Sequence, residues 1–154
     1  MNTFRISKYE PQFRQNNRYL KDEWTDYSDI GKMFNGIPLT EREYFSTEKQ
    51  YISCLINILE SAKVESISIE SLEDYDKTIW YNKQRLTMEN IPEIIRDCLR
   101  NKCWCRLEGD GAYIHFGYDY YVYLGIELPY IVTESICRRY KLFCELFQSP
   151  YRKD

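Results

Sequence analysis

The most regular alternation of apolar and polar positions lies in Cys103–Gly125 and predicts a β-hairpin. Asp110-Gly111 favours a two-residue type I′ turn, because both central positions of that turn need a positive φ. This turn pairs Arg106 with His115 across the two strands. One face then carries Cys103, Cys105, Leu107, Ile114 and Phe116, and the other carries Trp104, Arg106, Glu108, Tyr113 and His115. The first set is typical of a buried core, and the second is aromatic and polar.

Three segments repeat apolar residues at helical spacing. The longest runs from Thr40 to about Ala62, and Thr40 with Glu43 matches a capping box at its start. A second helix follows the cap region at Thr87–Asn90 and continues to about residue 101, with Pro92 in its first turn. Thr133–Lys141 predicts a short third helix, capped by Thr133.

Four further segments alternate as strands do: Thr3–Tyr9, Val64–Ser71, Tyr118–Gly125 and Leu142–Gln148. Gly117 lies before the third of them, and its position fits either a bulge or a tight turn. The order of helices and strands predicts an α+β fold with a mainly antiparallel sheet, a central hairpin and about three helices on one face. The length of 154 residues predicts a single domain over residues 1–154.

Two segments are less regular. Asp22–Gly36 places aromatic and aliphatic residues at roughly helical intervals, with Ser28 as the expected cap of one or two turns and Asn35-Gly36 as their end. Leu72–Gln84 has no clear period, and Ile79-Trp80-Tyr81 within it fits either a short edge strand or a turn of helix.

The composition excludes several classes of protein. No apolar run approaches the ~20 residues of a membrane-spanning helix, and Met1–Tyr9 lacks the apolar centre of a signal peptide. We therefore expect no membrane contact and a cytoplasmic location, in which the six cysteines remain thiols. Cys103-x-Cys105 does not have the spacing of zinc ligands, so we expect no metal and no cofactor.

The net charge is −3 and is unevenly distributed. Residues 41–80 hold nine acidic and four basic residues, and Glu70, Glu73 and Asp74 among them are the positions at which we expect charge reversal to weaken binding. Such a segment suits a basic protein partner, although acidic stretches are commonly only solvated surface. No cluster of Lys and Arg indicates a track for nucleic acid, so we expect no nucleic-acid binding.

His115 is the only histidine, and catalysis that needs an imidazole would have to use it. Arg106 and Tyr113 share its face, and Asp119 could orient it if Gly117 folds the chain back. This set allows an enzyme or a small-molecule- or nucleotide-binding protein centred on His115. No activated nucleophile accompanies it, so the sequence favours a non-catalytic role.

The aromatic and polar sheet face has the composition of a protein-binding surface, since Trp, Tyr and Arg are enriched at interface hot spots. It stays available if helices cover only the other face, whereas Asp22–Gly36 or the region around Trp80 would hide it by folding over it. The residues predicted to bind a partner are Trp104, Arg106, Tyr113, His115, Asp119, Tyr121, Tyr123, Glu70, Glu73 and Asp74.

Four stretches carry a resemblance to a known family: FRISKYEPQFR near the start, KDEWTDYSDIGK at 21–32, HFGYDYYVYLG at 115–125 and FQSPY at 147–151. With them the chain resembles a family of small, largely uncharacterised, single-domain proteins of Gram-positive bacteria that are similar to toxin-immunity proteins. The resemblance implies a bacterial immunity protein that neutralises a toxin by binding it, as in a toxin–antitoxin pair. It assigns no functional residues.

Overall fold

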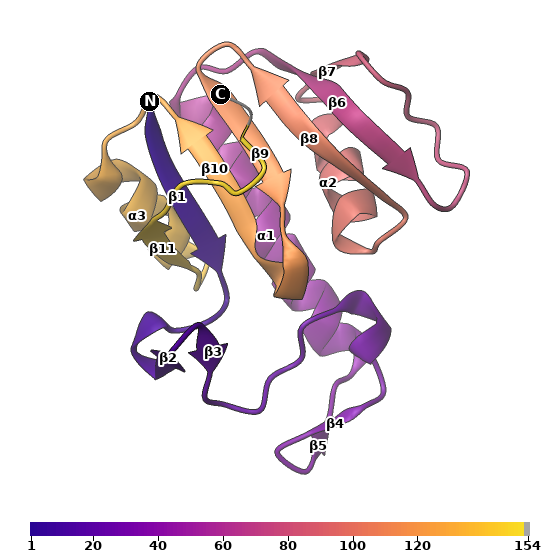
Figure 1. Cartoon of the computed structure of the whole chain (residues 1–154), viewed down its shortest axis with the longest axis vertical. Coiled ribbons are helices and arrows are strands. Elements are labelled where there is room, and N and C mark those ends of the chain that lie inside the picture. Colours follow the sequence, from indigo (N-terminus) through magenta and orange to yellow (C-terminus); the bar gives the residue numbers. More distant parts are fainter. Residues whose placement is uncertain (153–154) are drawn as a thin grey trace.

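The computed structural model describes residues 1–152 and confirms the α+β fold. Its centre is an antiparallel sheet of seven strands (Figure 1). Across the sheet the order is β11 (Phe143–Leu146), β1 (Asn2–Ser7), β10 (Val122–Ile126), β9 (Ala112–Phe116), β8 (Cys103–Gly109), β6 (Ser66–Asp74) and β7 (Arg85–Thr87). Strands that are distant in sequence, such as β1 and β10, are therefore neighbours at its centre.

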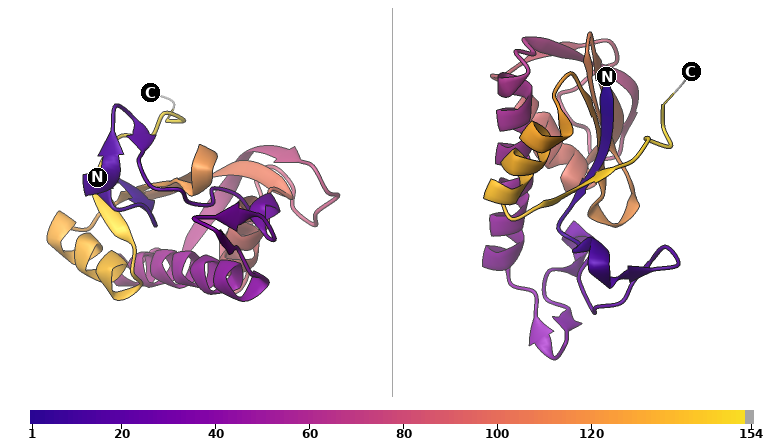
Figure 2. Two further views of the ribbon diagram at one scale, coloured as in Figure 1. Left: turned by 90° about the horizontal axis from the view of Figure 1, so that it is seen from below. Right: turned by 90° about the vertical axis from the view of Figure 1, so that its left-hand side faces the viewer.

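The three helices α1 (Glu41–Ser61), α2 (Ile91–Leu99) and α3 (Tyr130–Arg139) lie on one face of the sheet (Figure 2). The hydroxyl of Thr40 accepts the backbone N–H of Glu43 at 3.1 Å, so the predicted cap of α1 is confirmed, although only this half of the capping box forms. On α1, the buried carboxylate of Glu48 accepts two hydrogen bonds of 2.8 Å from the guanidinium of Arg100. This ion pair fastens the end of α2 to α1.

The predicted register of the hairpin is confirmed, with Arg106 opposite His115 and Leu107 opposite Ile114. The predicted core face of this hairpin is buried against the helices. The turn type is wrong, because of its two central residues only Gly111 has a positive φ, of 77°. One glycine is enough to reverse the chain here, so the register does not depend on a type I′ turn.

The connection from β9 to β10 differs from the predicted strand. Residues 118–120 form a 3₁₀ turn, η3 (Tyr118–Tyr120), so β10 begins at Val122 and not at Tyr118. Gly117 begins this turn, and its N–H donates to the carbonyl of Tyr121 at 2.9 Å. The alternation of Tyr118–Gly125 continues through the turn in sequence, but the backbone does not continue as a strand.

Several predicted caps and ends also differ. Helix α3 begins at Tyr130 after Pro129, so Thr133 lies inside the helix, where its hydroxyl donates to the Pro129 carbonyl at 3.2 Å. In Asp22–Gly36 the single turn is η2 (Tyr27–Asp29), and Asp26 caps it in place of Ser28. Asn35-Gly36 does not end a helix but is the turn between two short strands, β4 (Met33–Phe34) and β5 (Ile37–Pro38).

Leu72–Gln84 contains neither an edge strand nor a helical turn around Trp80. Strand β6 extends through Leu72 to Asp74, and a loop then leads to β7. Trp80 is buried, and its indole N–H donates to Asp97 on α2 at 2.8 Å. The remaining small elements lie in the N-terminal connection: η1 (Pro11–Phe13), β2 (Arg14–Gln15) and β3 (Arg18–Tyr19).

Aromatic rings fill the core beneath η3. The ring of Tyr120 lies 4.8 Å from that of Tyr51 and 5.0 Å from that of Trp24, measured between centroids. Its hydroxyl donates to the hydroxyl of Tyr44 at 2.9 Å. These contacts tie the β9–β10 connection to α1 and to the segment before η2. Among residues 1–152, no helix is long and apolar enough to cross a membrane.

Gly125 on β10 provides the first test of the packing. A Cβ at this position would lie 2.3 Å from Cε1 of Tyr113, its partner on β9. We therefore expect Gly125→Ala to lower the free energy of unfolding by about 1–3 kcal/mol in urea denaturation, because the ring must move. In a Tyr113→Val background the same change should cost much less. Equal costs in both backgrounds would show that Tyr113 does not clash.

Candidate binding site

A row of polar and aromatic side chains crosses the sheet face that lies opposite the helices. The registers place one residue from each of six adjacent strands in this row. From β11 to β6 the row reads Glu145, Arg5, Tyr123, His115, Arg106 and Glu70. It therefore brings together four of the residues that the sequence predicted for partner binding.

His115 is fully buried at the centre of this row. Its Nδ1 lies 2.7 Å from the hydroxyl of Ser149, and its Nε2 lies 2.7 Å from a carboxylate oxygen of Glu108. The ring stacks on Tyr113 with centroids 4.3 Å apart. Glu108 and Ser149 therefore orient the imidazole, a role that the sequence analysis considered for Asp119. With both nitrogens bonded and no exposed surface, the ring has no free position for a substrate.

Glu108 connects His115 to Arg106. The same carboxylate oxygen accepts a 2.8 Å hydrogen bond from the Arg106 guanidinium. Burial on its own would raise the pKa of the Glu108 carboxyl, but the hydrogen bond and charge of His115 and the charge of Arg106 outweigh it and hold the pKa below its ordinary value. Arg106 and Glu108 therefore form a charged pair that belongs to the sheet.

The last part of the described chain covers this face (Figure 2). After β11, Phe147 stacks on Tyr123 with centroids 5.6 Å apart, and Tyr151 packs 5.3 Å from Trp104. Ser149 lies between them, on His115. The cover expected from Asp22–Gly36 or from the Trp80 region is thus supplied by residues 147–151.

The predicted partner-binding residues therefore differ in accessibility. Those still exposed lie at one end of the sheet: Glu73, Asp74 and Asp119. Trp104, Arg106, Tyr121 and Glu70 are partly buried, whereas Tyr113, His115 and Tyr123 are buried. Glu70 is paired with Lys83, and Asp74 accepts hydrogen bonds from Thr78 that shape the loop after β6. The structure does not bring all ten residues into one accessible surface.

Two cavities open at this end of the sheet, on either side of Tyr118. The first measures about 260 Å³ and the second about 330 Å³. Both are lined by Cys98 and Asn101 from the end of α2 and by Phe116, Gly117 and Tyr118 from the β9–β10 connection. The first also reaches Asp26 and Asp119, and the second also reaches Glu73 and Trp104.

The backbone of η3 holds Tyr118 out between the cavities. Asp119 and Tyr120 both have positive φ, of 57° and 66°, and a tyrosine rarely adopts this conformation. Since Tyr120 is buried in the aromatic core, the turn is fixed, and Tyr118 is left 85% exposed. Strained backbone of this kind is concentrated at functional sites in proteins. The sequence analysis missed this turn and Asn101, which also has a positive φ, because the alternation of apolar and polar residues does not reveal such backbone conformations.

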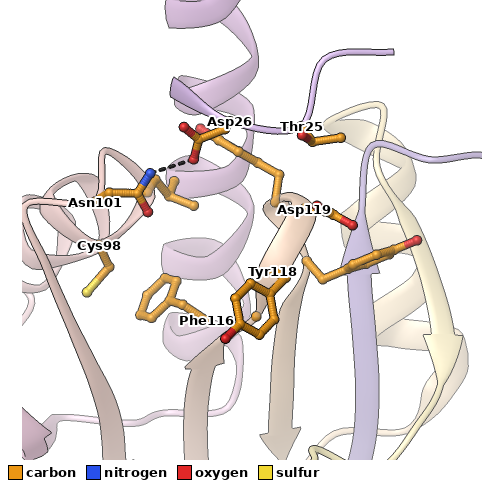
Figure 3. Close-up of a pocket in the computed structure, with 11 residues that line it drawn as sticks. Thr25, Asp26, Cys98, Asn101, Phe116, Tyr118 and Asp119 are labelled. Carbon is orange, nitrogen blue, oxygen red and sulfur yellow. Dashed lines mark hydrogen bonds between the residues drawn. The ribbon is translucent and has the colours of Figure 1, made fainter. Parts of the chain in front are cut away.

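Figure 3 shows how the first cavity is built. The side-chain amide of Asn101 reaches across to the carboxylate of Asp26, while Tyr118 and Asp119 line the opposite wall. Burial would raise the pKa of Asp26, but hydrogen bonds from Ser28, Asn101 and the backbone outweigh it and lower the pKa. The cavity therefore carries negative charge at neutral pH.

The cysteines are free and buried, as expected of thiols that act as small apolar side chains. Cys98 Sγ lies 3.8 Å from that of Cys103 and 3.7 Å from that of Cys105. Burial raises the pKa of the Cys98 thiol, so it stays protonated. Within residues 1–152 no group of three His, Cys, Asp or Glu side chains is placed to hold a metal ion.

Comparison with known proteins adds no relative: no protein-family model matches the chain, and neither the curated proteins nor the solved structures contain a match. The resemblance to immunity-like proteins stays a prediction.

The cover over His115 can be tested by chemical modification. In the full-length protein we expect diethyl pyrocarbonate to leave this single histidine unmodified, because it is fully buried. A chain that ends at Leu146 should be modified at close to the rate of the unfolded protein, as measured by peptide mass spectrometry. Circular dichroism establishes that the shortened chain is folded, and Tyr151→Ala serves as a milder variant. Equal protection in all three proteins would contradict the assigned cover.

The lowered pKa of Glu108 predicts a pH-dependent stability. A carboxyl whose folded pKa is below its unfolded value stabilises the fold above the unfolded pKa and loses this effect as the pH falls through the folded pKa. We expect Glu108→Gln to lower the free energy of unfolding by about 1–2 kcal/mol at pH 7. The difference from wild type should shrink as the pH falls below 4.5, the ordinary value of this pKa. Asp110→Asn, on the exposed turn, is the control and should show no such trend.

Proposed function

We propose that this protein is a non-catalytic binding module that docks onto a basic protein partner, in the manner of an immunity protein that neutralises a bacterial toxin. The contact surface would be the end of the sheet around Tyr118, which we call the η3 surface and define as Glu73, Tyr75, Trp104, Tyr118 and Asp119. It keeps three of the residues that the sequence proposed, namely Glu73, Trp104 and Asp119.

One observation carries the proposal: an aromatic side chain stands 85% exposed on a fixed turn, beside carboxylates without a basic partner. Among residues 1–152, no Lys or Arg forms an ion pair with Glu73 or Asp119, whereas Glu48, Glu70 and Glu145 each have at least one basic partner. Exposed Tyr and Trp supply contact area at small entropic cost, and unpaired acids steer a cationic partner.

The other candidate, an enzyme or small-molecule-binding protein centred on His115, has less support. The imidazole is covered by Ser149 and bonded at both nitrogens, so an acid–base role would first require the C-terminal cover to move. The proposed binding role needs no such movement, because the η3 surface is open in the described structure.

Charge reversal on the η3 surface tests this proposal. We expect tagged wild-type protein to recover a stoichiometric partner from its native host at low salt and to release it as the salt concentration rises. Asp119→Lys should reduce the recovery at least about tenfold, because it places a like charge against a basic surface. Asp110→Lys makes the same change on the exposed turn between β8 and β9 and should recover the partner as wild type does. Equal recovery by the two variants would remove the η3 surface from the interaction.

A further inference from the structure

We propose that the second cavity binds the alkylated ammonium group of an organic cation. Its aromatic lining comes from parts of the chain that are far apart in sequence: the loop after β6, β8, the end of β9, η3 and the C-terminal segment. Each of these parts contributes one aromatic residue to the lining, in that order Tyr75, Trp104, Phe116, Tyr118 and Tyr151. Half of the ten lining residues are therefore aromatic, which is the composition of the cages that recognise quaternary ammonium groups.

The charge of the lining favours a cation. Glu73 is its only charged residue, and no Lys or Arg lines it. A carboxylate and the negative faces of aromatic rings attract the same kind of ligand. An anion would be repelled by Glu73. A bare metal ion would find one carboxylate beside Asn101 and the buried thiols of Cys98 and Cys103, which within residues 1–152 do not form a group placed to hold a metal. An alkylated ammonium ion is weakly hydrated and apolar at its rim, so it loses little by leaving water.

Within residues 1–152, no Lys or Arg of the chain itself lies over the aromatic rings of this cavity. Elsewhere in residues 1–152, basic side chains lie over aromatic faces, as with Lys8 Nζ at 4.1 Å from the Trp24 centroid and the guanidinium carbon of Arg5 at 4.2 Å from that of Phe147. None of the cation–π contacts formed within this part of the chain involves a ring of the second cavity.

Several of these side chains are held in place before any ligand arrives. The indole N–H of Trp104 donates to the carbonyl of Phe116 at 2.8 Å, and the ring of Tyr151 packs against the indole. The hydroxyl of Tyr75 donates to the carboxylate of Glu73 at 3.1 Å, which keeps the charge at the rim. A preorganised cage loses little side-chain entropy on binding. The volume of about 330 Å³ admits a trimethylammonium group together with its linker.

This ligand chemistry has two sources: a free quaternary ammonium compound, or a methylated lysine side chain on a protein. The second source rests on the proposed function, because it would place a residue of the basic partner in the cavity beside Tyr118. The first source does not depend on a protein partner. A binding experiment with small probes therefore separates the two ideas.

The test is a titration of the full-length ¹⁵N-labelled protein with choline and with N-acetyl-trimethyllysine amide, followed by NMR of the three indole N–H resonances. We expect a saturable shift of Trp104, with the buried indoles of Trp24 and Trp80 unchanged. The matched neutral probe is 3,3-dimethylbutanol, which has the shape of choline without its charge, and it should bind at least about tenfold more weakly.

Variants locate the effect. Glu73→Gln and Tyr75→Leu are exposed changes that leave the sheet intact, and each should weaken binding of the cationic probes about fivefold to tenfold. Glu65→Gln, an exposed acid outside both cavities, should leave binding unchanged. Tighter binding of the trimethyllysine derivative would identify a side chain as the ligand, and tighter binding of choline would identify a free compound.

The proposal is overturned if neither cation shifts Trp104 in a saturable way, if the neutral probe binds as tightly as choline, or if Glu73→Gln binds as wild type does. Cation binding with no effect of Asp119→Lys on partner recovery would support the cage and contradict the proposed docking function. Partner recovery that depends on Asp119, without cation binding, would support the docking function and contradict the cage.

Discussion

A seven-stranded sheet has two large faces, and the three helices of this protein cover only one of them (Figure 2). The remaining face must either stay in water or be covered by something that satisfies its polar groups, since an unpaired buried polar group is costly. The chain meets most of this constraint with its C-terminal segment, whose rings pack on Tyr123 and Trp104 and whose Ser149 pairs with His115. Four buried polar atoms stay without a hydrogen-bond partner among the described residues: Arg5 Nε, Arg14 Nη2, Tyr113 Oη and Glu145 Oε1. Because the C-terminal segment covers the middle of the face, the exposed surface lies at the end of the sheet around Tyr118.

The polar row across that face is organised by pairs of opposite charge. At one end Arg5 and Arg14 share the carboxylate of Glu145, at 3.3 and 2.7 Å, and near the other end Glu108 accepts from both Arg106 and His115. Partly buried charges are tolerated in such a place only when each is bonded. The row is therefore a set of side chains that pair across adjacent strands, and this pairing is what brings its His, Tyr and Arg residues together.

Function is better sought where the sheet ends. There two contacts fix the β9–β10 connection. The ring of Tyr120 is buried in the aromatic core, and the Gly117 N–H donates a hydrogen bond to the Tyr121 carbonyl. A rigid turn with a positive φ at Asp119 and Tyr120 keeps Tyr118 exposed between two cavities. Conformational strain, carboxylates without a basic partner and exposed aromatic surface coincide at this one place in the described part of the chain.

The sequence by itself determined the main helices and strands and the two faces of the hairpin. The capped helix after Thr40 and the register that pairs Arg106 with His115 follow from local spacing, because helical and strand periods are set by neighbours a few residues apart. Only the tertiary structure decided which face is open. That depends on contacts such as His115 with Ser149, which are 34 residues apart and leave no periodic signal in the sequence. The same holds for the second cavity, whose walls meet only after Tyr75, Trp104 and Tyr151 are brought together by the sheet and by the segment that crosses it.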